Sequence, residues 1–466
     1  MTFYDDISTY SNNTAIVTEQ STQISYKTLL SLADGIGIHI KERCLVFLLC
    51  RNCLESVAGY VGILRARAVP VLITEAIDPS FLTNLMEAYH PEYVFSPTDT
   101  QKATYFGTTL YSFDNYTLAK TGYTGESQCH DQLALLLMTS GSTGSPRFVR
   151  QSYKNINSNA EAISQYLQIE AADRPITTMP MNYTYGLSII NSHLLNGASI
   201  VLTQDTLMNR KFWDLMKAHS VTTFGGVPYI YEMLKKLRFQ RMDLPTLKYL
   251  TQAGGRLSPE LSAQFADYCT HKSIKFIVMY GQTEATARMA YLSWEYARTK
   301  VGSVGMPIPG GNFWLEDDSG KTIVGSHRPG ELVYRGDNVT MGHAENRQDL
   351  CRGDDNGGIL HTGDMAQRDE DGFYYIVGRK NRFLKMFGHR VSLDEVEQLV
   401  RTVGYDCACT GVDDNLNIYV TKPDDDDKVK NLVIHRMGIN QAGFSIIPID
   451  DLPWNEAGKV MYSALN

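Results

Sequence analysis

Apolar residues follow two kinds of pattern in the first third of the chain. Residues 44–49 and 69–72 are uninterrupted apolar runs of the kind found in buried strands. Residues 25–30 and 53–67 instead space their apolar positions as an amphipathic helix does. Strand, helix and strand in that order are typical of parallel strands joined across one face of a sheet. We therefore predict a parallel sheet covered by helices, and we expect this region to serve as scaffold.

The alternation of strands and helices continues through the middle of the chain. Residues 152–168 are predicted to form a helix, and residues 274–279 a buried strand. Between them, residues 221–237 and 249–271 each have the pattern of a strand followed by a helix.

Beyond residue 300 the pattern changes to short alternating runs separated by dense turns. Residues 301–307 and 330–336 favour a small β-barrel. Residues 392–400 are predicted to form a helix, because the chain there opens with the spacing of a capping box. The acidic run at 424–427 is typical of a solvated hairpin tip.

Length and charge narrow the class of protein. With 466 residues, the chain exceeds what one hydrophobic core usually supports, so two or more domains are expected. A net charge of −8 argues against nucleic acid or an anionic membrane as an electrostatic partner. No apolar run is long enough to span a bilayer, and the acidic N-terminal residues do not resemble a secretory signal. The 8 cysteines lack the spacing of zinc ligands, so we expect reduced thiols in a cytoplasmic protein.

The stretch from Leu135 to Arg147 carries the strongest chemical signal. An apolar strand there gives way to small hydroxyl residues and glycines, namely Thr139, Ser140, Gly141, Ser142, Thr143 and Gly144. Glycines let successive N–H groups turn into one concavity and hydroxyls add donors, which suits a polyphosphate. The loop lacks the Lys-Ser/Thr pair of a Walker site, because it ends in Pro146 and Arg147. Taken alone, the stretch is equally consistent with a Ser/Gly-rich surface loop.

Further motifs follow this loop along the chain. They are Met179-Pro-Met-Asn-Tyr183-Thr-Tyr185-Gly-Leu187, Ala253-Gly254-Gly255, Tyr280-Gly281-Gln282-Thr283-Glu284, Thr362-Gly-Asp364, Gly378-Arg379 and Gly458-Lys459. The carboxylate of Glu284, at the end of a predicted strand, suits a hard cation that bridges phosphate oxygens. Asp364 is an acceptor of the right kind for a vicinal diol.

In this order the motifs resemble those of the adenylate-forming superfamily, which includes acyl- and aryl-CoA synthetases, luciferases and peptide-synthetase adenylation domains. The resemblance runs from the N-terminal third to the last residues of the chain. It implies an α/β fold with a large N-terminal domain, residues 1–380, made of two βα-layered subdomains plus the small β-barrel. A small mobile α+β domain, residues 381–466, is expected to follow and to carry the catalytic lysine.

The resemblance also implies a role for each matching residue. The catalytic residues would be Lys459, Thr283, Glu284 and Tyr183, with Glu284 also at the magnesium ion. ATP would be bound by Thr139, Ser140, Gly141, Ser142, Thr143, Gly144, Arg147, Ala253, Gly254, Gly255, Tyr280, Gly281, Gln282, Asp364 and Arg379. The acyl pocket would be lined by Tyr183, Tyr185, Phe224, Gly225, Gly254, Tyr280 and Gly305. Asn381 would be the hinge, and Lys385 and Gly388 would line the thiol tunnel.

The expected reaction is ATP-dependent activation of a carboxylic acid to an acyl adenylate, followed by transfer to a thiol. Residues 179–187 contain no acidic residue that could hold an amino group, which favours a plain acyl or aryl acid over an amino acid. ATP and Mg²⁺ are the implied cofactors, and coenzyme A is the preferred thiol. The short C-terminal domain keeps open a phosphopantetheine arm on a carrier protein as the acceptor.

A second alternative is a catalytically silent nucleotide-binding protein. The chain departs from the family pattern at Arg147, Tyr183, Asn381 and Tyr462, and these departures are the support for that alternative. The retained Thr283, Glu284, Asp364, Arg379 and Lys459 argue against it.

Overall fold

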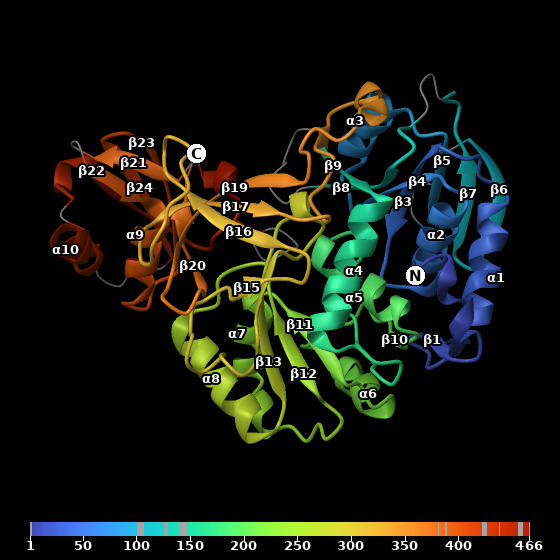
Figure 1. Ribbon diagram of the computed structural model, residues 1–466, viewed down its shortest axis with the longest axis horizontal. Helices are drawn as coiled ribbons and strands as arrows, with labels where there is room; N and C mark the ends of the chain where they lie inside the picture. The colour runs from blue at the N-terminus through green and yellow to red at the C-terminus, as the bar shows by residue number, and fades with distance from the viewer. Residues whose placement is uncertain are drawn as a thin grey trace. The chain divides into compact units, whose positions relative to one another are not determined.

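The computed structural model describes residues 2–99, 107–124, 129–138, 147–380, 382–386, 389–421, 426–437, 439–454 and 460–465 (Figure 1). The chain divides into two compact units. Unit 1 comprises Met1–Asn312 and Arg335–Leu360, and unit 2 comprises Phe313–Tyr334 and His361–Asn466. The predicted boundary after Lys380 falls inside unit 2 in this division, and a split at that residue remains a prediction.

The largest sheet of unit 1 contains eight strands within the described residues. Their order is β18 (His343–Ala344), β9 (Phe148–Ser152), β8 (Leu133–Met138), β4 (Val69–Thr74), β3 (Leu45–Cys50), β5 (Tyr93–Pro97), β7 (Tyr116–Lys120) and β6 (Thr108–Phe113). The central pairs β3–β4, β3–β5 and β4–β8 are parallel, as the sequence predicts. The outer pairs β5–β7, β6–β7, β8–β9 and β18–β9 are antiparallel.

Helices cover both faces of this sheet. They are α1 (Tyr26–Gly37), α2 (Leu54–Arg65) and α3 (Pro79–Tyr89), and the first two match predicted helices. Alternate residues of β3 belong to different cores, because successive side chains of a strand point to opposite faces. Val46 and Leu48 pack in the cluster that includes α1 and α2, whereas Phe47 and Leu49 pack in the cluster that includes α3.

A second sheet of unit 1 has the order β11 (Thr223–Gly226), β12 (Tyr249–Gln252), β13 (Lys275–Tyr280), β14 (Ala290–Leu292) and β15 (Met306–Pro307). Strands β11, β12 and β13 are parallel, and β14 and β15 continue antiparallel. The helices of this region are α4 (Tyr153–Leu167), α5 (Thr184–Leu195), α6 (Arg210–Ala218), α7 (Pro228–Lys236) and α8 (Pro259–His271). The two predicted strand–helix units are thus β11–α7 and β12–α8. Helices α4 and α5 lie side by side (Figure 1).

The remaining elements of unit 1 are short. Strands β10 (Ile200–Val201), β1 (Thr14–Val17) and β2 (Gln23–Ser25) form a small sheet. The 3-10 turns are η1 (Asp6–Tyr10), η3 (Phe239–Arg241), η4 (Thr283–Ala285) and η5 (Arg347–Cys351).

The small sheets belong to unit 2 for most of their length. One has the order β16 (Asn312–Glu316), β17 (Gly330–Arg335), β19 (Ile359–Arg368) and β20 (Tyr374–Arg379). Of the two stretches predicted to form a small β-barrel, 330–336 contributes β17 to this sheet, whereas 301–307 contributes β15 to the second sheet of unit 1. The others are β21 (Phe383–Met386) with β22 (His389–Ser392), and β23 (Cys407–Val412) with β24 (Asn415–Thr421) and β25 (Phe444–Ile449). Unit 2 also contains α9 (Leu393–Arg401), α10 (Asp426–Met437), η6 (Gln441–Gly443) and η7 (Tyr462–Leu465).

The hairpin tip predicted at 424–427 is wrong for residues 426 and 427, whereas 424 and 425 lie outside the described residues. Asp426 and Asp427 begin α10 instead, and the strands before and after that helix, β24 and β25, are parallel. Parallel neighbours cannot be joined by a tight turn and need a crossover connection, which α10 provides. Acidic side chains at the start of a helix also interact favourably with the positive end of the helix dipole.

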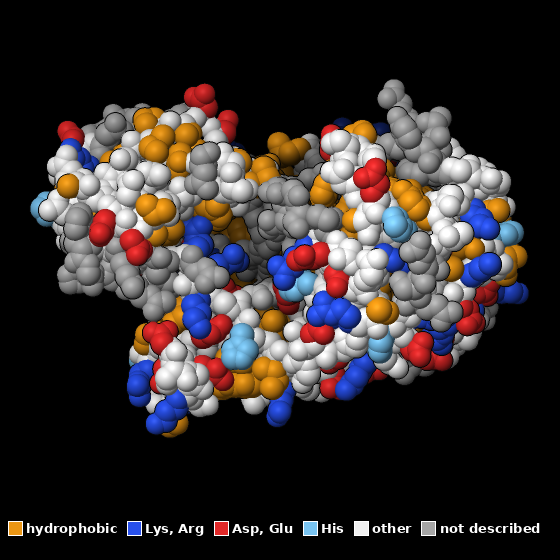
Figure 2. All heavy atoms as spheres, turned by 90° about the horizontal axis from the view of Figure 1, so that it is seen from above, with side chains coloured by type: hydrophobic (Ala, Val, Ile, Leu, Met, Phe, Trp, Pro, Cys, Tyr) orange, Lys and Arg blue, Asp and Glu red, His pale blue; other side chains and the backbone are white. Residues whose placement is uncertain are grey.

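Charged side chains are mixed by sign on the surface. On the face shown in Figure 2, Lys and Arg side chains of the described residues are interspersed with Asp and Glu. Within the residues that the structure describes, no helix has both the length and the apolar character that crossing a bilayer requires.

Candidate active site

Several predicted site residues lie outside the described part of the chain. These are the phosphate-loop residues 139–144, the hinge residue Asn381, the tunnel residue Gly388 and the catalytic Lys459. The side chain of Lys385 on β21 is not described either. The roles predicted for these residues therefore stay predictions.

The strands on either side of the predicted phosphate loop pair with each other. Met138 at the end of β8 lies opposite Phe148 at the start of β9 in an antiparallel register. Arg147 directly precedes β9 and is exposed to solvent. On its other edge β9 pairs with β18, which places Val149 opposite His343. The strand that leaves the loop is therefore joined directly to His343.

The motif Tyr280-Gly281-Gln282-Thr283-Glu284 begins at the C-terminal end of β13 in the second sheet. The motif folds back immediately into η4, and the returning backbone passes very close to Gly281. A Cβ on Gly281 would lie 1.7 Å from the carbonyl oxygen of Ala287, so no larger residue fits without displacing the backbone. The glycine thus makes the tight return after β13 sterically possible.

Glu284 is tied to the segment that leads into β18. Its carbonyl oxygen accepts a hydrogen bond from the backbone N–H of Thr340 at 3.0 Å. Its carboxylate Oε1 lies 3.4 Å from Nε2 of His343, and the two side chains are 26% and 29% exposed. Gln151 on β9 donates to the carbonyl oxygen of Thr283 at 3.4 Å. Thr283 and Glu284 are therefore held beside the strand that follows the phosphate loop, and the Glu284 side chain is partly exposed.

The side chain of Asn338 holds the turn after Glu284. Its Nδ2 donates to the carbonyl oxygens of Ala285 and Arg288, each at 2.8 Å. The hydroxyl of Thr286 donates back to the carbonyl oxygen of Asn338 at 2.8 Å. The turn contains two positive φ angles, 55° at Thr286 and 107° at Ala287. A backbone in this sparsely populated region needs such surrounding bonds to persist.

Tyr183 and Gly254 lie in direct contact at the ends of α5 and β12. Gly254 has a φ of +81°, and a Cβ there would lie 2.8 Å from Oη of Tyr183. Ala253 donates its N–H to Gly226 at 3.2 Å, and Gly255 accepts a hydrogen bond from the side chain of Gln252 at 2.8 Å. The Ala-Gly-Gly stretch is thereby fixed against Tyr183, which is predicted both as a catalytic residue and for the acyl pocket.

The predicted acyl-pocket residues Tyr185 and Gly225 also meet. Tyr185 donates its hydroxyl to the carbonyl oxygen of Thr251 at 2.9 Å, and a Cβ on Gly225 would lie 2.5 Å from that hydroxyl. The rings of Tyr183 and Tyr185 pack edge to face, with their centroids 6.5 Å apart. Burial raises the pKa of Tyr185 to about 12, so the phenol is neutral at pH 7. Phe224 lines a cavity together with Gly225.

Gly305 lies elsewhere in the second sheet. It packs against the backbone of Tyr291 on β14, where a Cβ would lie 1.9 Å from the carbonyl oxygen. Its role in the acyl pocket stays a prediction.

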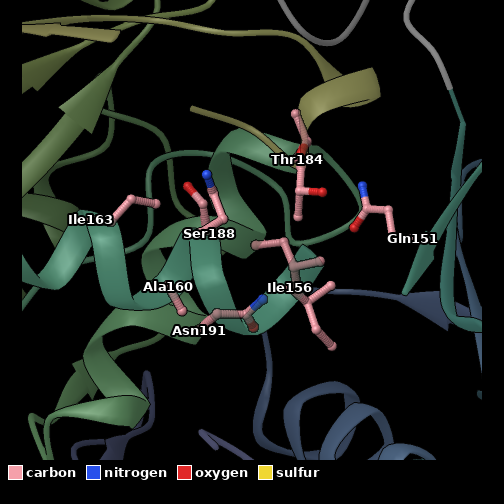
Figure 3. A pocket seen from close by; sticks show the side chains of 10 residues that line it. Gln151, Ile156, Ala160, Ile163, Thr184, Ser188 and Asn191 are labelled. Atoms are coloured by element: carbon pink, nitrogen blue, oxygen red, sulfur yellow. The ribbon is translucent and has the colours of Figure 1, made fainter. Parts of the chain in front are cut away.

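A small pocket lies between α4 and α5. In Figure 3 the side chains of Ile156, Ala160 and Ile163 on α4 face those of Thr184, Ser188 and Asn191 on α5, with Gln151 at one end. Asn191 has a buried Oδ1 without a hydrogen-bond partner among the described residues. Thr184 and Ser188 belong to the helix that begins directly after Tyr183, so this pocket adjoins a residue predicted for the acyl pocket.

In unit 2, Asp364 and Arg379 are direct neighbours. They lie opposite each other on the antiparallel strands β19 and β20, and Nε of Arg379 is 3.4 Å from Oδ1 of Asp364. The backbone N–H of Asp364 donates to the hydroxyl of Thr362 at 3.1 Å. The side chain of Asp364 is 8% exposed, whereas that of Arg379 is 60% exposed. The two residues predicted to hold the ribose are thus brought together by the structure.

A buried ion pair anchors the C-terminal turn of unit 2. Arg382 donates to Glu397 at 2.5 Å, and its guanidinium lies 3.8 Å from the ring centre of Tyr462. The hydroxyl of Tyr462 donates to Glu397 at 3.2 Å. Burial raises the pKa of Glu397, and the charge of Arg382 opposes that shift. Tyr462, at a position where the family pattern has an arginine, therefore attaches η7 to α9.

Sequence reasoning missed Asn338, His343 and Arg288. His343 is 59 residues from Glu284 and belongs to a two-residue strand, so no local pattern marks it. Asn338 and Arg288 belong to none of the quoted motifs, although Arg288 follows Glu284 by four positions. Only the fold brings His343 to Glu284 and Asn338 to Arg288.

Comparison with known proteins identifies relatives. A 2-succinylbenzoate–CoA ligase from Geobacillus sp. (strain WCH70) is 29% identical over 291 residues, which are 61% of this chain and 56% of that protein. A 2-succinylbenzoate–CoA ligase from Bacillus cereus (strain AH820) is 27% identical over 373 residues, which are 78% of this chain and 73% of that protein. The chain thus spans little more than half the length of the first of these relatives.

Solved structures share the fold. The o-succinylbenzoate CoA synthetase (MenE) of Bacillus subtilis, in complex with the acyl-adenylate intermediate OSB-AMP, matches with a TM-score of 0.81 and 18% identity, over 100% of this chain and 98% of that one. ATP-bound MatB from Rhodopseudomonas palustris matches with a TM-score of 0.80 and 20% identity, over 100% of this chain and 98% of that one. Both are mixed α/β folds with a large N-terminal and a smaller C-terminal domain, as the sequence predicts for this chain.

The model of one protein family matches most of the chain directly. The matched residues, 3–343, include the phosphate loop, Tyr183, Gly254 and Glu284. The chain therefore belongs to the family of AMP-binding enzymes, within the adenylate-forming superfamily.

Proposed function

We propose that this protein is an acid–thiol ligase that activates a carboxylic acid with ATP and transfers the acyl group to coenzyme A. The observation that carries the proposal is the placement of Thr283 and Glu284. They lie beside β9, the strand that follows the phosphate loop, and the side chain of Glu284 is partly exposed. Family membership and the names of the relatives, which are CoA ligases, support the same reaction.

The first half-reaction overcomes the poor reactivity of a carboxylate. A carboxylate oxygen attacks the α-phosphorus of ATP, the bond from that phosphorus to the bridging oxygen breaks, and pyrophosphate leaves. In the second half-reaction a thiolate attacks the acyl carbon and AMP leaves. Negative charge accumulates on phosphate oxygens in the first transition state, so the site must present positive groups and N–H donors there.

Residues of this chain supply those groups in the proposal. The N–H groups and hydroxyls of residues 139–144 bind the polyphosphate, with Arg147 adding positive charge. Asp364 and Arg379 hold the ribose, and Ala253 to Gly255 lie against the adenine ring. Lys459 joins the substrate carboxylate to the α-phosphate. Asn381 is the proposed hinge that removes Lys459, and Lys385 and Gly388 line the path of the thiol.

The surroundings of Glu284 fit a magnesium ion. Mg²⁺ is usually bound through one or two carboxylates plus phosphate oxygens and water, not by an all-protein cage. Glu284 provides one partly exposed carboxylate, and no cluster of three or more potential metal ligands occurs among the described residues. When bound with ATP, the ion would supply electrostatic stabilisation of the phosphate charge. Glu284 would then hold the ion, and His343 would orient the Glu284 carboxylate.

The test is ATP–pyrophosphate exchange with a panel of carboxylic acids. The panel begins with 2-succinylbenzoate, the acid in the relatives' names, and extends to aryl and medium-sized acids. At least one acid should support exchange, and Glu284→Gln should abolish most of it, whereas Glu295→Gln on the exposed loop after β14 should not. An enzyme that binds ATP without exchange for any acid would overturn the proposal in favour of a silent nucleotide-binding protein.

The acceptor is tested separately once an acid is found. Coenzyme A and a phosphopantetheine-bearing carrier protein are offered in parallel, and thioester formation is followed by mass spectrometry. A CoA thioester is the expected product. Thioester formation on the carrier protein alone would leave the activation step intact and replace coenzyme A as the acceptor.

A further inference from the structure

Arg382 is the first residue after the proposed hinge residue Asn381, and its backbone is fixed on both sides. Its N–H donates to the carbonyl oxygen of Arg379, the last residue of β20, at 3.0 Å. Its carbonyl oxygen accepts a hydrogen bond from the N–H of Leu393, the first residue of α9, at 2.9 Å. The side chain of Arg382 is 13% exposed. A largely buried guanidinium therefore extends from a backbone that is attached to both β20 and α9.

Two carboxylates of α9 lie against this guanidinium. Glu397, whose side chain is 4% exposed, lies 2.5 Å from Nη2 of Arg382, and Asp394 lies 2.7 Å from its Nε. Glu397 also accepts a hydrogen bond from the backbone N–H of Cys409 on β23 at 2.8 Å. A buried ion pair that is completed by further hydrogen bonds holds one geometry, because separating the two groups would leave a buried charge without a partner.

The same ion pair holds Tyr462, which follows the predicted catalytic lysine by three positions. Its ring centre lies 3.8 Å from Cζ of Arg382, an arrangement typical of a cation–π contact. Its hydroxyl donates to Oε2 of Glu397 at 3.2 Å. Tyr462 is one of the positions at which the chain departs from the family pattern, which has an arginine there. In this chain the guanidinium beside position 462 belongs to the residue that follows the proposed hinge.

The described residues that flank the lysine's segment are joined to each other as well. Trp454 and Val460 form an antiparallel bridge, and the N–H of Met461 donates to the carbonyl oxygen of Pro453 at 2.7 Å. Val460 and Tyr462 also pack against a buried cluster of Ala408, Leu452 and Leu465. The chain directly after the lysine is thus fixed by main-chain bonds, by apolar packing and by the side chain of Tyr462.

We infer that Arg382, Glu397 and Tyr462 are positioning residues for Lys459, because they fix the backbone after the lysine to the first residue beyond the hinge. A lysine carries its charge on a flexible stem, so the protein can hold only the backbone in advance. A displacement of about 1 Å at a reacting group can lower a rate by about 100-fold. The three residues act through Lys459 and therefore serve only the half-reaction in which it takes part. The inference rests on the proposed function, because it concerns the lysine of that reaction.

The first experiment measures the two half-reactions separately, with the acid that supports exchange. Tyr462→Leu should lower kcat for ATP–pyrophosphate exchange by about 10–100-fold, because the segment of Lys459 loses its attachment. Thioester formation from a synthetic acyl adenylate and coenzyme A should stay within about 2-fold of wild type. Tyr462→Phe keeps the ring over Arg382 and should recover most of the exchange. Equal loss in both half-reactions, or no loss in either, would overturn the inference.

Tyr405→Leu is the matched control. Tyr405 is a half-buried tyrosine that packs against the hydrophobic core of unit 2, and its ring centre lies 5.9 Å from Nζ of Lys428. The control therefore removes an equivalent ring and cation–π contact away from Glu397. Both half-reactions should keep their wild-type rates in Tyr405→Leu. A loss of exchange equal to that in Tyr462→Leu would mean that any weakened packing in unit 2 has this effect, and it would overturn the inference.

A double variant tests whether Tyr462 acts through the lysine. Adenylate formation is compared between Lys459→Ala and Lys459→Ala/Tyr462→Leu. Without the lysine there is nothing left for Tyr462 to position, so the two rates should agree within about 2-fold. A further loss of about 10–100-fold in the double variant would mean that the two residues act independently, and Tyr462 would then not be a positioning residue for Lys459.

Failure of the inference is distinguishable from failure of the proposed function. Absence of exchange with any acid in the wild type would overturn both. Wild-type exchange without the split between half-reactions would leave the ligase standing and overturn the inference alone. If Tyr462→Leu does not fold, Arg382→Lys decides, because it keeps a charge opposite Glu397 and loses the planar group over the ring. It should lower exchange by about 10-fold and spare thioester formation, and an equal effect on both would overturn the inference.

Discussion

His193 offers a quantitative test of the packing around α5. The residue is 2% exposed, and its ring nitrogens lie 2.8 Å from the carbonyl oxygen of Ile189 and 3.2 Å from the hydroxyl of Tyr249. Burial lowers its pKa from 6.5 to about 4. The unfolded chain therefore binds a proton on His193 more readily than the folded protein does. Stability that is fully present above pH 6.5 should be lost as the pH falls toward 4.

The size of the loss follows from the two pKa values. With 6.5 in the unfolded state and about 4 in the folded state, proton linkage reduces the free energy of unfolding by about 2 kcal/mol between pH 7 and pH 5. Domains are typically stable by only about 5–15 kcal/mol, so the change is large enough to measure. It belongs to unit 1, because His193 packs entirely within it.

The assay is urea unfolding at several pH values, followed by tryptophan fluorescence. A background with Trp314→Phe and Trp454→Phe leaves Trp213 and Trp294, both in unit 1, as reporters. His193→Gln should flatten the pH dependence by about 2 kcal/mol over this range, whereas His219→Gln, at a less buried histidine, should change it much less. An identical pH dependence with and without His193 would refute the reasoning.

Four further predictions concern the proposed site. Gly281→Ala should destabilise unit 1 by about 1–3 kcal/mol in urea unfolding, because its Cβ would collide with a backbone carbonyl, and unchanged stability would contradict the close approach. Glu284→Gln should lower the exchange rate and raise the Mg²⁺ concentration needed for half-maximal rate; an unchanged magnesium titration would remove it from the metal site. Asp364→Ala should raise the KM for ATP by about 10–100-fold through loss of charged hydrogen bonds, and wild-type kinetics would show that the ribose lies elsewhere. Lys459→Ala should cut adenylate formation by roughly 10²–10⁴-fold and spare thiol transfer from a synthetic adenylate, so equal loss in both half-reactions would mean a structural role.

Local sequence patterns were sufficient to predict most of the helices and strands near the site. Continuous apolar runs predicted β3, β4 and β13, and Thr283 and Glu284 follow the end of β13 in the turn η4. The cap of α9 was also predictable, since the side chain of Ser392 accepts a hydrogen bond from the N–H of Glu395. These features depend on neighbours within a few positions in the chain, which is the range over which periodicity and capping act.

Features that depend on distant contacts could not be predicted in this way. The acidic run at 424–427 has the composition of a turn, but the parallel pairing of β24 with β25 requires a crossover there, and only the whole sheet specifies that pairing. The residues that flank Arg288 in the chain do not distinguish it from an ordinary surface arginine after a loop. Its burial results from α4, α5 and β11 closing around it, which no short window contains.

Asn338 shows why the missed residues matter to function. Its one amide donates to the carbonyl oxygens of Ala285, which follows the proposed magnesium ligand, and of Arg288, whose guanidinium contacts the ring of Tyr185. Both groups are therefore positioned by the same turn, and that turn contains the positive φ angles of Thr286 and Ala287. A backbone held in this conformation keeps the two charged side chains in a fixed relation to each other. The proposed magnesium ligand and the arginine that contacts Tyr185 are thus set by a single segment, so loss of the Asn338 amide should disturb both together.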